Sequence, residues 1–317
     1  MSRLSTPKFP YFHSKFLLLA LFLLSLVSCE HQDDESEQAV LLKLKRYWLN
    51  PVAIKHWVPL VNSSFSHCSW PEIFCLNNSV IELSLRDKNI SGIIPSFICD
   101  LHNLEYIDLG WNYLQGEFPT SVYNCSKLEY LDLSQNLFVG ALPEDIHSLA
   151  DQLHYLDLGA NNFSGQFPAA IGRLQELRSL YLYQNLFNGS VPLQIGNLSE
   201  LENLGLAYNE LLPSKLPFSF KQLKKLKFLW MIRTNLIGEI PDFIGDMTAL
   251  EHINLSQNEL TGKIPDDLFL LMNLTHIYLY SNKLSGEIPQ VIKSLNLLEI
   301  DFSENNLTGT IPSDIGN

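Results

Sequence analysis

Lys55 ends the tetrapeptide Val-Ala-Ile-Lys, the strand sequence in which a protein kinase keeps the lysine that pairs with ATP phosphates. Such a lysine needs a Gly-rich loop upstream and His-Arg-Asp and Asp-Phe-Gly motifs downstream. None of them occurs, and the chain also lacks Gly-x-Ser-x-Gly, His-Glu-x-x-His and P-loop motifs. We therefore interpret the match as coincidental and expect no catalytic residue, no metal site and no cofactor.

The amino terminus has the layout of a secretory signal. Residues 1–29 contain Arg3, Lys8 and Lys15, an apolar run from Phe16 to Val27, and the small residues Ser28 and Cys29. The apolar run is too short for a span of about 30 Å. Removal of this segment leaves 18 basic and 34 acidic residues. A surface of this charge disfavours nucleic acid as a partner.

In an extracellular location, cysteines can form disulfides and asparagines can carry glycans. Cys68 and Cys75 are close in the chain, so we expect them to form a disulfide, whereas Cys99 and Cys125 could pair or remain buried thiols. Ten asparagines begin Asn-x-Ser/Thr glycosylation acceptors: Asn62, Asn77, Asn89, Asn124, Asn162, Asn188, Asn197, Asn254, Asn273 and Asn306.

The elements that would position any site come from a repeat that begins at residue 80. The template is LxxLxLxxNxLxGxxP, and its Asn slot recurs every 23 to 25 residues. That slot falls at Lys88, Asn112, Asn136, Asn161, Asn185, Asn209, Thr234, Asn258, Asn282 and Asn305, which number coils 1 to 10. This period predicts a leucine-rich repeat solenoid, an α/β fold with a parallel concave sheet. We expect the leucines to be buried and the Asn amide to bond the backbone of the turn.

The ends of the array differ from its middle. Residues 30–79 are predicted to form an N-terminal cap, with an amphipathic helix carrying Val40, Leu41, Leu44, Tyr47 and Trp48 before the disulfide loop. Residues 80–317 should form ten coils, and the C-terminal cap is missing, which suggests a fragment or truncated product. Lys88 and Thr234 break the Asn rule, and a lysine cluster at residues 215–227 is interpreted as a solvated convex loop.

Side chains in the same slot of adjacent coils should be stacked about 4.8 Å apart on the concave face. Aromatic side chains are favoured anchors in interfaces, and their number here favours ligand binding. The aspartates in the fifth slot are either a common residue of the repeat consensus, with water screening their charges, or they bind a lysine or arginine of a ligand. The predicted binding residues are Tyr106, Asp108, Trp111, Tyr130, Asp132, Tyr155, Asp157, Tyr181, Tyr183, Tyr208, Phe228, Trp230, Arg233, His252, His276 and Tyr278.

The segments "CSWPEIFC", "ICDLHNL", "VYNCSKLEYLDLSQN", "AYNELLPSKLP" and "LKKLKFLWM", in this order, resemble the ectodomains of plant HAESA-like leucine-rich repeat receptor kinases. The resemblance covers roughly residues 36–317. It implies a receptor that senses a secreted peptide or protein ligand on its concave face, with a co-receptor kinase of the somatic embryogenesis type. It also implies a cytoplasmic Ser/Thr kinase domain, which would follow a membrane anchor that is missing from this sequence.

Members of that family that read a peptide's carboxyl end use an Arg-x-Arg pair, which does not occur here. Only the earlier part of such a groove is therefore expected, on a protein that is secreted or lies on the extracellular face of the plasma membrane. The alternative is a secreted inhibitor of cell-wall hydrolases that resembles the polygalacturonase-inhibiting proteins. Those end in a second cysteine cap, and this chain has no cysteine after Cys125.

Overall fold

The computed structural model describes residues 36–59 and 66–313 of the 317-residue chain. The predicted signal peptide and the acceptor Asn62 lie outside the described residues. In the described part no helix is both long and apolar enough to cross a membrane.

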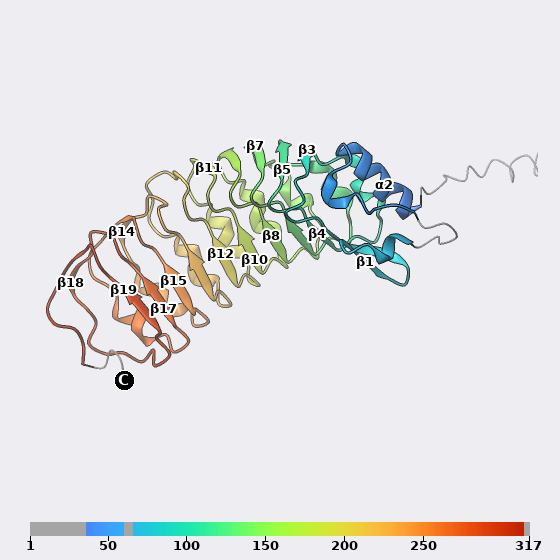
Figure 1. Cartoon of the computed structure of the whole chain (residues 1–317). Coiled ribbons are helices and arrows are strands. Elements are labelled where there is room, and N and C mark those ends of the chain that lie inside the picture. Colours follow the sequence, from blue (N-terminus) through green and yellow to red (C-terminus); the bar gives the residue numbers. More distant parts are fainter. Residues whose placement is uncertain (1–35, 60–65, 314–317) are drawn as a thin grey trace, which may run out of the picture. The chain divides into compact units, whose positions relative to one another are not determined.

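Each coil contributes one short strand to a long sheet, and the strands follow one another in chain order (Figure 1). All neighbouring strands are parallel except the first pair. Residues about two dozen apart pair in register, as in Tyr106 with Tyr130 and Asp108 with Asp132. The columns predicted from the repeat are therefore confirmed. The eleven strands are β1 (Ile73–Leu76), β2 (Ser79–Ser84), β4 (Tyr106–Asp108), β6 (Tyr130–Asp132), β8 (Tyr155–Asp157), β10 (Ser179–Tyr181), β12 (Asn203–Gly205), β13 (Phe228–Trp230), β15 (His252–Asn254), β17 (His276–Tyr278) and β19 (Glu299–Asp301).

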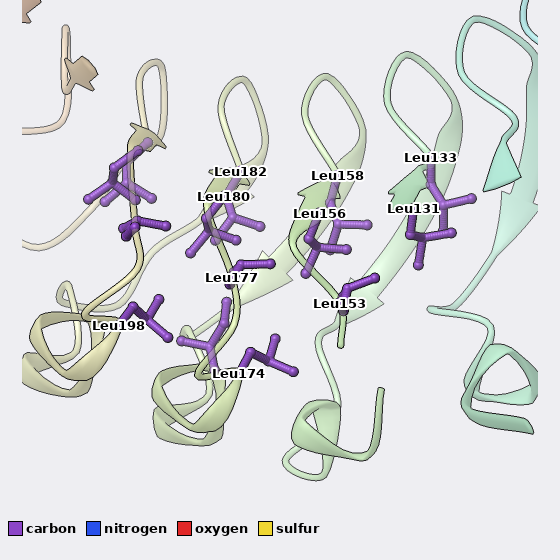
Figure 2. Close-up of a cluster of buried hydrophobic side chains, with 14 of the residues drawn as sticks. Leu131, Leu133, Leu153, Leu156, Leu158, Leu174, Leu177, Leu180, Leu182 and Leu198 are labelled. Atoms are coloured by element: carbon purple, nitrogen blue, oxygen red, sulfur yellow. The ribbon is translucent and has the colours of Figure 1, made fainter. Parts of the chain in front are cut away.

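Behind this sheet lies a core built from the template leucines. Leu131 and Leu133 of one coil lie beside Leu156 and Leu158 of the next, and all four are fully buried (Figure 2). A single coil could not bury these side chains alone, because its neighbour supplies the covering surface. Each buried leucine contributes about 1.5–3 kcal/mol.

A row of 3₁₀ helices forms the opposite side of most coils. Many of them begin directly after the proline that ends the template, because proline presets φ for a helical turn and needs no hydrogen-bond partner for its nitrogen. They are η1 (Val52–Ile54) and η2 (Ser66–Ser69) in the cap, and η3 (Ser96–Asp100), η4 (Thr120–Asn124), η5 (Ile146–Ser148), η6 (Ala169–Arg173), η7 (Leu193–Asn197), η8 (Phe218–Gln222), η9 (Asp242–Asp246) and η10 (Asp266–Leu270) in the coils.

The Asn slot forms a hydrogen-bonded ladder between coils, as predicted. The amide nitrogen of Asn136 donates to the carbonyl oxygens of Leu109 (2.9 Å) and Leu133 (3.1 Å), and its oxygen accepts the N–H of Leu114 (2.9 Å). One buried side chain thus satisfies backbone groups of two coils. In coil 7 the hydroxyl of Thr234 bonds the Met231 carbonyl (2.9 Å), so a shorter side chain serves the same turn.

Shorter strands pair along a second side of the coils, with a gap at coil 6 and a further break between coils 8 and 9. Segment 210–216 carries Pro213 and no glycine, and within it only Ser214 forms an isolated bridge, to Leu236. Beside this gap the buried side-chain oxygen of Asn209 has no hydrogen-bond partner. The strands are β3 (Ser91–Gly92), β5 (Tyr113–Gly116), β7 (Leu137–Ala141), β9 (Asn162–Gly165) and β11 (Leu186–Phe187) before the gap, and β14 (Ile237–Glu239), β16 (Glu259–Thr261), β18 (Ser285–Glu287) and β20 (Asn306–Thr308) after it.

The N-terminal cap covers the first coil, as predicted. Helix α2 (Glu37–Tyr47) buries Val40, Leu41 and Leu44, and the indole nitrogen of Trp48 donates to the carbonyl of Ile93 (3.0 Å). The expected disulfide between Cys68 and Cys75 is present. A second one joins Cys99 to Cys125, which settles the pairing that the sequence left open.

Glu72 explains why coil 1 has a lysine in its Asn slot. Its buried carboxylate accepts hydrogen bonds from Lys88 (2.9 Å), Trp57 (3.0 Å) and His56 (2.9 Å). Burial alone would raise the pKa of Glu72, but these hydrogen bonds hold it below its usual value. Lys88 therefore fastens the cap to the first coil.

Lys55 follows η1 and lies exposed in a turn of the cap, where its carbonyl accepts a hydrogen bond from Lys45 (3.0 Å). A kinase lysine would lie on a strand. The structure therefore supports the interpretation of the tetrapeptide as coincidental.

Candidate ligand-binding face

The exposed side of the long sheet, which we call the sheet face, carries the third- and fifth-slot side chains of ten coils. Tyr106, Tyr130 and Tyr155 form a stack in which successive ring centroids are 4.0 Å apart. The three rings are half-buried, and burial raises the pKa of Tyr130 and Tyr155. Their hydroxyl groups therefore stay protonated and remain hydrogen-bond donors.

The aspartates beside this stack do not lie in the open. Asp108, Asp132 and Asp157 are only 6%, 2% and 7% exposed. The expectation that they face solvent, with water screening their charges, was wrong. Each carboxylate accepts a hydrogen bond from the backbone N–H two residues ahead, as Asp132 does from Ser134 (2.8 Å).

Arg86 of coil 1 forms ion pairs with two of the three carboxylates. Its guanidinium lies 2.7 Å from the Asp132 carboxylate and 3.6 Å from that of Asp108. Although burial disfavours its charge, the two carboxylates raise the pKa of Arg86. The aspartate column therefore already contains one bound cation, supplied by the chain itself.

Asp157 is the member of the column that Arg86 does not reach. One carboxylate oxygen accepts the Gly159 N–H (2.8 Å), and the other has only the Tyr155 hydroxyl at 3.5 Å. In the part of the chain that the structure describes, no basic side chain forms an ion pair with it. Burial, with the charge of Asp132 added, raises the pKa of Asp157 to about 7.

A hollow of about 410 Å³ opens on the sheet face beside Asp157. Its walls are aromatic, and the rings of Tyr183 and Trp230 lie 5.2 Å apart. Sequence reading named most of its lining but missed Asn203. It also did not assign a role to Gly205, whose missing side chain lets the Tyr181 ring pack close to the backbone. The lining residues are Tyr155, Asp157, Tyr181, Tyr183, Asn203, Phe228 and Trp230.

The aromatic row continues through the later coils. Phe228 contacts His252 with 4.7 Å between ring centroids, and His252 contacts His276 at 5.2 Å. Tyr278 lies 5.4 Å from His252. Burial, together with the neighbouring His276, lowers the pKa of His252 to about 4, so this ring is neutral at the pH where an ordinary histidine titrates.

The remaining predicted binding residues lie at the turn that follows each strand. Trp111, Tyr208 and Arg233 adopt left-handed backbone conformations with φ of 57°, 58° and 53°, and their side chains are exposed. Tyr208 contacts the hollow through Trp230 (6.1 Å between centroids). Trp111 lies two coils before Asp157, whereas Arg233 lies in the coil of Trp230, so the predicted residues form a long face with one hollow rather than one compact site.

The glycosylation acceptors divide into two groups. All those that the structure describes are exposed except Asn254, which is half-buried in β15 on the sheet face. Its oxygen accepts the Ser256 N–H (3.1 Å).

Two other polar clusters proved to be structural. Lys225 and Lys227 of the lysine cluster pair with Glu200 (2.5 Å) and Glu202 (2.6 Å). His67, Cys68 and Cys75 lie close enough to share a metal ion, but both sulfurs are committed to a disulfide.

Comparison of the sequence with known families supports the leucine-rich repeat fold. Two family models, both described as leucine rich repeat, match residues 78–138 and residues 152–174, 249–271, 273–295 and 296–317. Two curated proteins of Arabidopsis thaliana match short segments. The leucine-rich repeat receptor protein kinase EMS1 is 39% identical over 98 residues (30% of this chain, 8% of that protein), and polygalacturonase inhibitor 2 is 32% identical over 90 residues (27% and 26%).

Solved structures match over most of the chain. The Arabidopsis receptor kinase HAESA, in complex with the peptide hormone IDA and the co-receptor SERK1, superposes with a TM-score of 0.83 at 32% identity. That match covers 87% of this chain and 47% of the HAESA chain. A plant ice-binding protein superposes with a TM-score of 0.77 at 26% identity, covering 88% of this chain and 89% of that protein.

This chain therefore spans about half the length of the solved receptor ectodomain and a small part of the curated kinase. The repeat models, the parallel sheet and the N-terminal disulfides agree with one another. The chain is a leucine-rich repeat solenoid with the fold of the plant HAESA-like receptor-kinase ectodomains.

Proposed function

We propose that this protein senses a secreted peptide or protein ligand outside the cell and binds it on the sheet face. The observation that carries the proposal is the continuous row of partly exposed rings on that face, interrupted by one hollow at Trp230. Aromatic side chains supply large contact areas and lose little conformational entropy on binding, which is why they anchor interfaces.

The dimensions of the sheet face fit an extended ligand. Ten coils stacked about 4.8 Å apart span about 43 Å, which about thirteen residues of an extended peptide would cover. The HAESA structure, which contains a peptide hormone and a co-receptor, supports a peptide as the ligand class. By the same comparison we propose a co-receptor kinase of the somatic embryogenesis type as a partner and the extracellular face of the plasma membrane as the location.

The fold alone does not decide this function, because a plant ice-binding protein of similar length has it too. The test is therefore a binding experiment on the sheet face. The secreted chain would be panned against a displayed library of twelve-residue peptides, and enriched peptides would be measured against two variants. Phe228→Ala with Trp230→Ala removes two rings of the sheet face. Tyr113→Ala with Leu137→Ala removes two exposed side chains of the shorter strands.

We expect the first variant to lose binding at least tenfold, since two aromatic anchors at about 1–2 kcal/mol each exceed that factor. The second variant should bind as the unaltered chain does. Equal binding by both variants would exclude the sheet face as the ligand site. Both pairs are at least partly exposed, so neither change should lower the thermal midpoint by more than a few degrees.

A further inference from the structure

We propose that the hollow at Trp230 binds the positively charged side chain of a basic residue, preferably arginine, in the ligand. This inference rests on the proposed function and specifies the chemistry that one part of the sheet face recognises. It is carried by three observations: an uncompensated carboxylate, aromatic walls around it, and a guanidinium that the chain already binds in the same column.

The charge balance of the aspartate column is incomplete. Arg86 supplies one positive charge to three stacked carboxylates, and its guanidinium lies at Asp132 and Asp108. Asp157, next in the column, forms no ion pair among the described residues and is 7% exposed. A buried carboxylate without a partner is unfavourable, and a cation that reaches it from the hollow would relieve that cost.

The walls of the hollow suit a cation rather than an apolar side chain alone. Tyr181, Tyr183 and Trp230 surround the opening next to Asp157. Faces of tyrosine and tryptophan attract cations, and arginine stacks on them more readily than lysine because its guanidinium is planar and weakly hydrated.

Two glycines make this arrangement possible. A Cβ on Gly205 would lie 2.7 Å from the Tyr181 ring and 3.5 Å from the Trp230 ring, so Tyr181 can pack this close to the backbone only because residue 205 is glycine. A Cβ on Gly159 would lie 2.3 Å from the Tyr183 ring. Tyr183 can therefore lean over the backbone beside Asp157 only because residue 159 is glycine.

Arg86 shows how the column receives a guanidinium. It reaches across two coils to place one nitrogen 2.7 Å from Asp132, while the backbone N–H and the hydroxyl of Ser134 bond the other oxygen of that carboxylate. Asp157 has the same backbone bond, from Gly159, and its second oxygen has no close partner. A ligand arginine would form with Asp157 the ion pair that Arg86 forms with Asp132.

The test uses short peptides of defined charge as probes. The chain would be labelled with 5-fluorotryptophan, which gives five fluorine signals, and the signal of residue 230 would be assigned with Trp230→Phe. Acetyl-Gly-Arg-Gly-amide would be titrated beside its citrulline counterpart, which has nearly the same shape and no charge, and beside the lysine peptide. We expect the arginine peptide to shift the Trp230 signal saturably, with lysine weaker and citrulline at least fivefold weaker.

Asp157→Asn is the decisive variant, because asparagine can keep the hydrogen bond from Gly159. Asn254 already holds the same slot with an equivalent bond to Ser256. Asp301→Asn is the matched control, since Asp301 occupies this slot six coils away and bonds Ser303 in the same manner. We expect Asp157→Asn to abolish the preference for arginine over citrulline and Asp301→Asn to preserve it.

Equal shifts by the arginine and citrulline peptides would overturn the proposal, as would equal losses in both aspartate variants, which would indicate a diffuse effect of negative charge. Neither result would affect the alanine-variant test of the sheet face as a ligand site. Conversely, a ligand that binds the sheet face without a basic residue would leave the proposed function intact and remove this inference.

Discussion

Replacing Asp157 with asparagine should stabilise the protein at neutral and alkaline pH. The native state keeps this carboxyl buried beside Asp132, and its pKa rises from 3.8 to about 7. Since one pKa unit corresponds to about 1.4 kcal/mol, ionised Asp157 costs the native state up to about 4 kcal/mol relative to the unfolded chain. Asparagine carries no charge and can keep the bond to the Gly159 N–H, so most of that cost should disappear.

The sign of the pH dependence follows from linkage. Between pH 4 and 7 the native state holds a proton on Asp157 that the unfolded chain has released, so the stability of the unaltered protein falls as pH rises through this window. The charged and titratable groups that face this carboxyl are Asp132, Arg86, Tyr155, Tyr181 and Tyr183. From pH 5 to pH 7 the window covers two pH units, and the native carboxyl itself begins to ionise near pH 7, so the advantage of Asp157→Asn should grow by about 2 kcal/mol.

Urea unfolding followed by circular dichroism at pH 5, 6, 7 and 8 measures this difference directly. Asp301→Asn is again the control, because Asp301 is half-exposed at the far end of the sheet and its replacement should change stability little at any of these pH values. A difference between Asp157→Asn and the unaltered chain that stays constant from pH 5 to 8 would refute the reasoning. So would a variant that is less stable at pH 8, since the hydrogen bond would then outweigh the buried charge.

Three further predictions concern the frame around the sheet face. Asn136→Ala should lower the free energy of unfolding by about 2–4 kcal/mol, because it leaves buried backbone groups without partners. Asn209→Ala should lower it less, since the Asn209 oxygen has no hydrogen-bond partner to lose. Urea unfolding of the two variants in parallel measures the difference. Glu72→Ala should lower the free energy of unfolding by about 3–5 kcal/mol, because it leaves Lys88 without its buried carboxylate. Proteolysis near the cap should then be faster, and unchanged cleavage would exclude the proposal that the Glu72–Lys88 pair holds the cap to the first coil. Peptide mapping of the secreted protein should find glycan at exposed acceptors but none at Asn254, whose half-buried side chain already bonds Ser256; an occupied Asn254 would contradict the assignment of the sheet face to a ligand.

The repeat made the frame of this protein predictable from sequence. Each coil places the same residue type in the same environment, so Leu131, Leu156 and Leu180 could be assigned to the core from their shared slot alone. The same holds for the Asn ladder and for the register of the columns. Even the cap helix followed from helical spacing, although Tyr47 proved 43% exposed.

The burial of the aspartates was not predictable from alternation alone. Because successive residues of a strand point to opposite faces, the sequence predicts the face on which a side chain lies. The exposed fraction of that side chain depends in addition on the size of its neighbours on the same face. A half-buried tyrosine lies two residues before each of these aspartates on the same face of the sheet, and the Tyr155 hydroxyl lies 3.5 Å from Asp157. The pairing of Arg86 with Asp132 was equally hidden, because 46 residues separate the two and their contact depends on the direction of a long side chain. Gly205, by contrast, could have been noticed as a missing side chain in a column of large ones.

Burial of the aspartate column bears on the proposed cation site, because the fold does not compensate all of its charges. If the column served the fold alone, asparagine would serve as well as aspartate, and Asn254 shows that it fits this slot. Arg86 forms ion pairs with Asp132 and, at longer range, with Asp108, although burial still raises the pKa of Asp108. Asp157 forms no ion pair among the described residues, its ionised form is disfavoured by burial, and it lies against an open hollow. A ligand cation in this hollow would favour the ionised form of Asp157 and so stabilise the native state above the pH at which this carboxyl loses its proton, which is the linkage that the proposed arginine site requires.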